Sequence, residues 1–185
     1  MTIKCPSVIY FTPSAFLIHL LAITAFLMVS LSHSSPVRAS CGNPPLADVD
    51  WSHCDKRAAN LTAVNLMMAN LGHADLSGAR LDSANLEVAN LSHANLSGAN
   101  LSGADLEGAD FRGAILANAN LTRVIGLTDT QLSQASNLQG VNLSNLDLSG
   151  FDLSSINLSK AILVNTNLSD TQGGFIPSIT SNNIM

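Results

Sequence analysis

The residues with the clearest potential for chemistry are three histidines at equal intervals. His53, His73 and His93 lie 20 residues apart, and each occupies the last place of a five-residue unit. Neutral imidazole is a common ligand for zinc and copper. A fold that brings every twentieth residue into one column would stack these rings on its surface, so a metal-binding column is one hypothesis for function.

A simpler interpretation of the histidines is available. The last place of a repeat is a permissive surface position, and duplication copies whatever residue stands there. No cysteine or carboxylate shares the column, in which Gly113 follows His93. A metal site at these three residues therefore remains an alternative, and no cofactor is expected.

The elements that position these residues follow a five-residue period. Between Ala84 and Leu106 the chain reads ANLEV, ANLSH, ANLSG, ANLSG and ADL. A helix would space its apolar residues three and four apart, and a strand would alternate them, so neither simple pattern fits. Strict internal repetition instead indicates a solenoid, in which each unit is buried against its neighbours.

The repeat A-[N/D]-L-[S/T]-x resembles the pentapeptide-repeat family over most of the chain after the leader. The resemblance implies an all-β fold, a right-handed quadrilateral parallel β-helix in which four repeats form one coil. On that geometry the repeats make about 5.5 coils in two blocks. The family resemblance also implies a protein-binding or structural module rather than an enzyme.

The central position of each repeat is expected to fill the core, with a small residue, usually alanine, two places before it. Lys56 departs from this pattern, and we expect it to lie in a weakly formed first coil where its amine reaches water. The predicted core centres are Leu61, Leu66, Leu71, Leu76, Leu81, Leu86, Leu91, Leu96, Leu101, Leu106, Phe111, Leu116, Leu121, Leu138, Leu143, Leu148, Leu153, Leu158, Leu163 and Leu168.

Residues 1–39 have the organisation of a secretory signal peptide. Lys4 precedes a long apolar run, and Val37-Arg38-Ala39 is similar to a cleavage site before Ser40. The alternative is an uncleaved membrane anchor, because the apolar run approaches spanning length. We expect a secreted or periplasmic protein, with the membrane involved only through this segment if it is not removed.

Two cysteines remain after cleavage, and we expect them to form a disulfide. Cys54 lies two places before a central position and should face inward, whereas Cys41 lies in the N-terminal cap segment 40–48. In an oxidising compartment an isolated pair favours a bridge. Such a bridge would hold the cap segment across the open end of the solenoid.

The repeats form two blocks, residues 49–123 and 136–170, separated by a register break. Leu121 and Leu138 are both central but stand 17 residues apart, which is not a multiple of five. Within the break, 124–135, Thr128 and Gln131 have capping-box spacing. A short helical turn and a plain loop both remain possible there, and residues 171–185 form a C-terminal tail.

The remaining features exclude some functions and leave others open. Six of the eight basic residues lie beyond the leader with all 13 acidic ones, a net charge of −7, which argues against direct nucleic-acid binding. Some pentapeptide-repeat proteins imitate DNA with acidic rows and bind topoisomerases, but here the rows are mostly Asn. No catalytic triad or phosphate-binding loop is evident.

The sequence therefore predicts an exported, non-enzymatic module with an unidentified protein partner in the cell envelope. The first alternative is an acidic DNA mimic that binds a topoisomerase. The second is a periplasmic metal binder that uses His53, His73 and His93. Met67 and Met68 mark a small exposed apolar spot that a partner could contact.

Overall fold

The computed structural model describes residues 40–173, which belong to one compact unit. The predicted signal peptide, 1–39, and the end of the predicted tail, 174–185, lie outside the described residues. From residue 40 to residue 173, no helix combines the length and apolar character needed to cross a bilayer.

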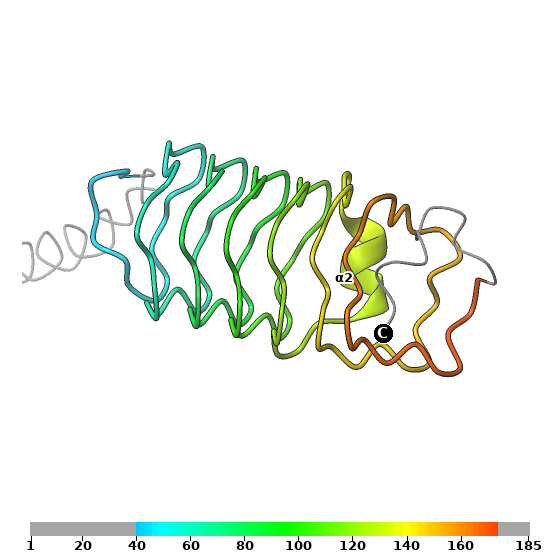
Figure 1. Ribbon diagram of the computed structural model, residues 1–185. Coiled ribbons are helices and arrows are strands. Elements are labelled where there is room, and N and C mark those ends of the chain that lie inside the picture. Colours follow the sequence, from blue (N-terminus) through cyan, green and yellow to red (C-terminus); the bar gives the residue numbers. More distant parts are fainter. Residues whose placement is uncertain (1–39, 174–185) are drawn as a thin grey trace, which may run out of the picture. The chain divides into compact units, whose positions relative to one another are not determined.

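The chain winds as a solenoid whose coils are joined by parallel main-chain pairing (Figure 1). The described residues form isolated parallel bridges rather than extended strands, because each flat piece holds only a few residues between turns. In the first block every bridge joins residues 20 apart, from Asp50–Asn70 to Asp105–Ile125. Positions 20 apart therefore form columns, as the repeat predicts.

Each repeat ends in a tight turn with a left-handed residue at its last place. In the first repeat, the N–H of Cys54 donates to the carbonyl of Trp51 at 3.0 Å, and His53 has a φ of 58°. One positive φ at the third of four residues is the pattern of a type II turn. This conformation is unfavourable for most side chains, which explains why glycine recurs at this place.

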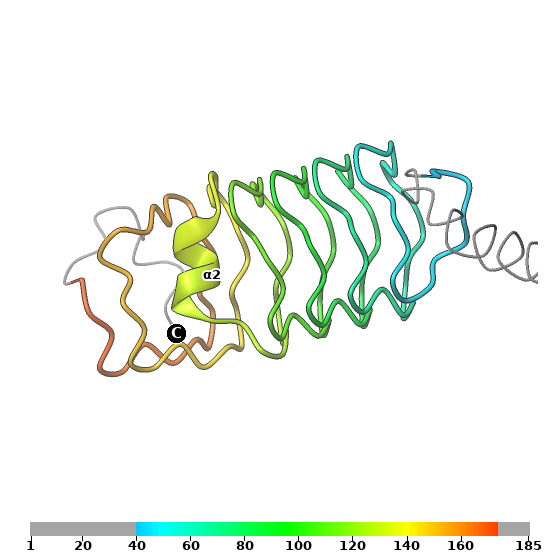
Figure 2. The ribbon, with the colours of Figure 1, turned by 180° about the vertical axis from the view of Figure 1, so that it is seen from behind.

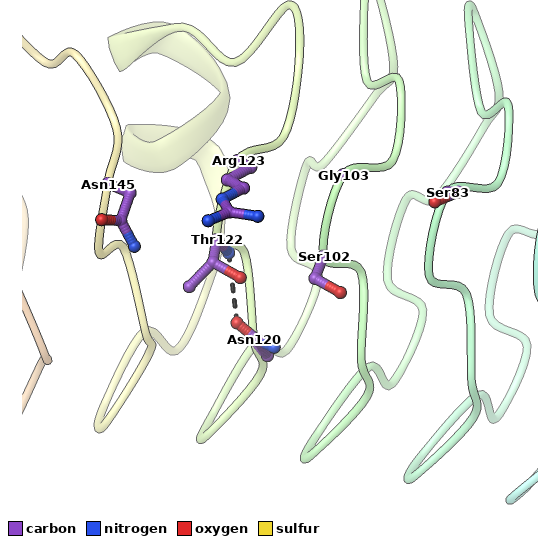
Figure 3. A pocket seen from close by; sticks show the side chains of 7 residues that line it. All are labelled: Ser83, Ser102, Gly103, Asn120, Thr122, Arg123 and Asn145. Carbon is purple, nitrogen blue, oxygen red and sulfur yellow. Dashed lines mark hydrogen bonds between the residues drawn. The ribbon is translucent and has the colours of Figure 1, made fainter.

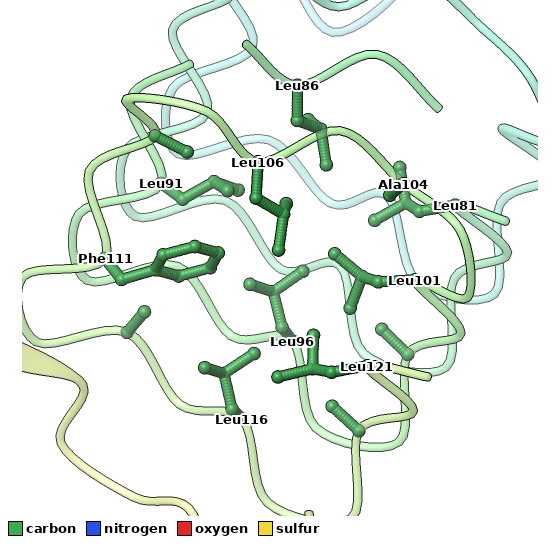
Figure 4. Close-up of a cluster of buried hydrophobic side chains, with 14 of the residues drawn as sticks. Leu81, Leu86, Leu91, Leu96, Leu101, Ala104, Leu106, Phe111, Leu116 and Leu121 are labelled. Carbon is green, nitrogen blue, oxygen red and sulfur yellow. The ribbon is translucent and has the colours of Figure 1, made fainter. Parts of the chain in front are cut away.

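The core consists of the central residues and the small residues two places before them (Figure 4). All predicted core centres are buried except Leu168, which is partly buried in the last described coil. In the first block the small partners from Ala69 to Ala119 are buried. In the second block Val141, Leu146 and Ile156 take their place, so bulkier side chains fill the interior there.

The register break contains the helix α2, Asp129–Gln134, which replaces one side of a coil (Figures 1 and 2). Of the two possibilities left open by the sequence, the structure has the helix, with Thr128 as N-cap and a complete capping box with Gln131. Around the helix the bridges join residues 22 apart, Ile115–Asn137 and Asn120–Asn142, and then return to 20. The second block thus continues the ladder of the first.

Gln131 holds α2 against the solenoid wall. Its side chain is buried, and its amide nitrogen donates to the carbonyls of Leu106 at 2.8 Å and Ala109 at 3.0 Å. Its amide oxygen accepts from the N–H of Thr128 at 2.8 Å. A regular coil pairs the Ala109 position with a main-chain N–H, as Asp110 does for Ala89. Gln131 therefore satisfies a carbonyl that the break would otherwise leave without a partner.

The N-terminal cap is fixed by three side chains as well as by main-chain bonds. Cys41 and Cys54 are joined by a disulfide across a Cα–Cα distance of 5.4 Å. The buried indole of Trp51 donates to the carbonyl of Asn43 at 3.1 Å. The Lys56 ammonium lies 3.6 Å from the centre of the Trp51 ring and donates to the Cys41 carbonyl at 2.7 Å.

The expectation of a weakly formed coil at Lys56 is wrong. The N–H of Lys56 donates to the carbonyl of Asp75 at 2.7 Å, so the ladder is intact at this position. Its long side chain leaves the core position and covers Trp51 instead, where partial burial lowers the pKa of the amine. A cation over an indole face is a favourable arrangement, so the lysine becomes part of the cap.

Candidate functional sites on the solenoid surface

The three histidines form a straight stack on one corner of the solenoid. The ring centres of His53 and His73 lie 4.7 Å apart and those of His73 and His93 lie 4.8 Å apart, with interplanar angles of 4° and 10°. The stack ends at Gly113 because the His93 ring covers that residue. A Cβ atom at Gly113 would lie 2.5 Å from Nδ1 of His93.

The stacked geometry offers little support to the metal hypothesis. Ring nitrogens bind metals through lone pairs in the ring plane, and parallel rings direct these lone pairs side by side rather than toward one point. Zinc in structural sites takes four protein ligands. Within residues 40–173, no group of three or more His, Cys, Asp or Glu side chains is placed to hold a metal ion. Metal binding by the column remains a prediction.

The flat outer faces carry ladders of amide and carboxylate side chains. Asn90 donates to Asn70 at 2.9 Å, and Asn70 donates to Asp50 at 3.0 Å. The oxygen of each residue in this place also accepts the N–H two residues later, as Asn90 does from Ser92. These side chains are therefore fixed by two neighbours, which makes the faces rigid before any partner arrives.

Arginines neutralise several of the surface carboxylates. Arg57 pairs with Asp55 at 2.7 Å, Arg80 with Asp82 at 3.6 Å and Arg112 with Asp110 at 2.6 Å. The side-chain hydrogen bond from Arg57 lowers the pKa of Asp55 to about 2, and that from Arg112 lowers the pKa of Asp110 below its usual value. These aspartates are interrupted by positive charge, unlike a row of phosphates.

A polar hollow of about 430 Å³ lies at another corner (Figure 3). Ser83, Gly103, Arg123 and Asn145 occupy one column of this corner, on successive coils. Figure 3 shows the Arg123 guanidinium beside Thr122, between the coil with Asn145 and the coil with Gly103. The hollow is lined by Ser83, Ser102, Gly103, Asn120, Thr122, Arg123 and Asn145.

A third corner is apolar and acidic, and we call it the docking edge: Leu46, Met68, Glu87, Val88 and Glu107. Leu46, Met68 and Val88 have exposed fractions of 59%, 55% and 54%. The N–H groups of Met68 and Val88 donate to the carbonyls of Glu87 at 2.9 Å and Glu107 at 2.8 Å, so these residues lie on successive coils. The two corner columns carry no lysine or arginine.

The sequence indicated part of this edge and missed the hollow. Met67 and Met68 stood out as adjacent exposed apolar residues, and the 20-residue spacing from Met68 to Val88 is the signal that extends the spot into an edge. The hollow arises where Gly103 separates Ser83 from Arg123 in one column. That arrangement is visible only after the residues are placed on coils.

The coil geometry defines the class of protein as a parallel β-helix solenoid, and comparison with known proteins gives the family. The model for pentapeptide repeats matches eight copies, over residues 46–78, 59–98, 89–125 and 136–171. The chain therefore belongs to the pentapeptide repeat family, whose members form right-handed β-helices and are generally non-enzymatic structural or binding modules. No curated protein matches the chain.

Several solved structures are similar to the chain. One is a pentapeptide repeat protein of the Arabidopsis thaliana thylakoid lumen, 27% identical, with 63% of this chain and 62% of that chain covered and a TM-score of 0.37. This chain thus spans less than two thirds of that protein. HetL, involved in heterocyst differentiation regulation in the cyanobacterium Nostoc, is 31% identical, with 69% and 71% covered and a TM-score of 0.31.

A third similar structure is QnrB1, a plasmid-mediated fluoroquinolone resistance protein. It is 20% identical, with 75% of this chain and 80% of QnrB1 covered and a TM-score of 0.35. The functions named for these proteins remain theirs. Family membership rests on the matched repeats and on the 20-residue ladder of this chain.

Proposed function

We propose that this protein is an exported, non-enzymatic module that binds a protein partner in the cell envelope through the docking edge. The observation that carries the proposal is the gathering of Leu46, Met68 and Val88, three of the most exposed large apolar residues among the described ones, on one corner. Exposed apolar groups that gather on one surface are typical of interaction sites.

The charge of the docking edge indicates the chemistry of the partner. Glu87 and Glu107 lie on the same corner as Met68 and Val88, without a basic residue in the two corner columns. A complementary partner segment presents apolar side chains together with lysine or arginine. Opposite charges at the rim of an interface guide association and orientation more than they add affinity.

The rigidity of the solenoid supports a binding role over catalysis. The parallel ladder and the side-chain amide ladders fix the surface in advance, so association requires little ordering of this protein. Export is supported by the sequence of residues 1–39, with its basic start, apolar run and cleavage pattern. None of the observations on residues 40–173 favours the DNA-mimic alternative.

The proposal is tested by capture of proteins from envelope extracts of the source organism. The bait is the tagged protein, compared with the double variant Met68→Ser/Val88→Ser. The matched control is Ile162→Ser/Val164→Ser, because these side chains are also apolar and exposed, at 39% and 37%, but lie on another part of the solenoid. One partner captured by the wild type and the control, but lost with the docking-edge variant, is expected. Equal capture by all three baits would contradict the proposal.

Export is tested separately with residues 1–39 fused to a reporter that is active only outside the cytoplasm. Reporter activity is expected. A silent reporter would contradict export without affecting the docking edge.

A further inference from the structure

The polar hollow around Arg123 exists because one column changes side-chain size between coils. Gly103 has a φ of 69°, and a Cβ atom there would meet only the Ser83 hydroxyl, at 3.6 Å. The missing side chain leaves open space between Ser83 and Arg123, as Figure 3 shows. A larger residue at position 103 would fill that space.

Arg123 differs from the other arginines of the described residues. Arg57, Arg80 and Arg112 each lie within salt-bridge distance of an aspartate. The guanidinium of Arg123 makes no hydrogen bond or ion pair with any residue of the described part of the chain. It faces the hollow with its planar set of donors unused.

The rest of the lining adds donors and no negative charge. The hydroxyls of Ser83, Ser102 and Thr122 line the hollow and make no hydrogen bond within residues 40–173. The amide of Asn145 accepts from Asn165 through its oxygen at 3.3 Å, which leaves its nitrogen available. No aspartate or glutamate is among the lining residues.

We propose that this hollow is a binding site for a carboxylate group, with Arg123 as its cation. The guanidinium fork matches the two oxygens of a carboxylate in a bidentate pair, and nearby hydroxyls can donate to the same oxygens. The site holds one positive charge, which a monoanion neutralises. A dianionic phosphate would leave an uncompensated negative charge on a protein that is already acidic.

The chemistry of the site is tested by NMR titration of the purified protein with sodium acetate, against sodium chloride at the same ionic strength. Amide signals of Gly103, Thr122 and Arg123 are expected to shift and saturate with acetate alone. Arg123→Gln is expected to weaken acetate binding by on the order of tenfold, the value of a charge-assisted pair. Arg112→Gln, which removes an arginine already paired with Asp110, is expected to leave the binding unchanged.

A second variant keeps the charge and removes the space. Gly103→Asn suits the left-handed turn, since Asn118, Asn145 and Asn165 adopt φ values of 58°, 61° and 57° at this place of the repeat. Its side chain is expected to occupy the hollow and abolish acetate binding in a folded protein. Shifts that do not saturate, or that persist unchanged in both Arg123→Gln and Gly103→Asn, would overturn the proposal.

The carboxylate can come from a protein side chain or from a small soluble acid. Capture of the envelope partner with Arg123→Gln as bait distinguishes the two sources. Loss of capture assigns the carboxylate to the partner, whereas unchanged capture with saturable acetate binding assigns it to a soluble acid. The hollow and the docking edge lie at different corners, so the failure of one proposal leaves the other standing.

Discussion

The side-chain amide of Gln131 donates to the main-chain carbonyl of Ala109 at 3.0 Å, and so completes the ladder where α2 interrupts it. The same amide nitrogen reaches the carbonyl of Leu106 at 2.8 Å. One side chain thus replaces the pairing that a full coil would supply. The continuity of the solenoid across the break depends on this residue.

Replacement of Gln131 by alanine should therefore destabilise the fold. The change leaves two buried carbonyls without donors and removes the capping box, which together should cost about 2–3 kcal/mol. Urea denaturation measures the free energy of unfolding. Gln134→Ala is the control, because Gln134 is exposed in the same helix. Equal stability of the two variants would show that Gln131 does not hold the helix.

Reduction of the disulfide should loosen the N-terminal cap. Cys41 and Cys54 are 13 residues apart, and closure of such a loop contributes about 3 kcal/mol in the chain-entropy model. Urea denaturation with and without a reducing agent should differ by that amount. The double variant Cys41→Ser/Cys54→Ser should match the reduced wild type and show no further response. A reducing agent without effect on the wild type would mean that the bridge is not formed in solution.

The turn geometry makes a prediction at Gly98, which has a φ of 66° and no atom near its missing Cβ. Gly98→Val should destabilise by about 1–2 kcal/mol from backbone strain alone, because there is no side-chain clash. Gly98→Asn should cost less, since asparagine tolerates the left-handed conformation. Thermal unfolding measures both variants, and equal losses would argue that the turn is not left-handed at this residue.

The Arg57–Asp55 pair predicts a pH dependence of stability at acid pH. The pKa of Asp55 in the folded chain, about 2, lies below the ordinary aspartate value near 4. Its contribution is therefore complete above about pH 4 and is lost as the pH falls toward 2. Arg57→Gln should flatten the stability profile in this window.

Arg123→Gln is the control for the acid profile, because its guanidinium has no carboxylate partner among the described residues. That variant should keep the wild-type slope. Since the Asp55 side chain is largely exposed, added salt should reduce the difference between Arg57→Gln and wild type. A profile that Arg57→Gln leaves unchanged would remove the pair from the account.

The periodic part of the fold follows from the sequence, and the aperiodic part does not. A strict five-residue period places Leu86 and Leu106 in one column, because identical units can stack in only one register. The break offers no such rule. A separation of 17 residues between Leu121 and Leu138 shows that the register changes, but not which side of the coil is replaced.

The partners of Gln131 could not be predicted for the same reason. Which carbonyl lacks a donor depends on the 22-residue bridges around the helix, which the sequence does not specify. Lys56 was misjudged because the repeat reports only the position of a side chain in its unit. The attraction of its ammonium for the Trp51 face depends on a neighbouring repeat of different composition.

The most direct test of the proposed function is photo-crosslinking in living cells of the source organism. A photoreactive amino acid at Val88 samples the docking edge, and the same group at Val164 samples another exposed apolar position. A discrete cross-linked protein at Val88, absent at Val164, is the predicted result, and its contact segment should combine apolar and basic residues. No product at Val88, or the same products at both positions, would contradict a docking role for this edge.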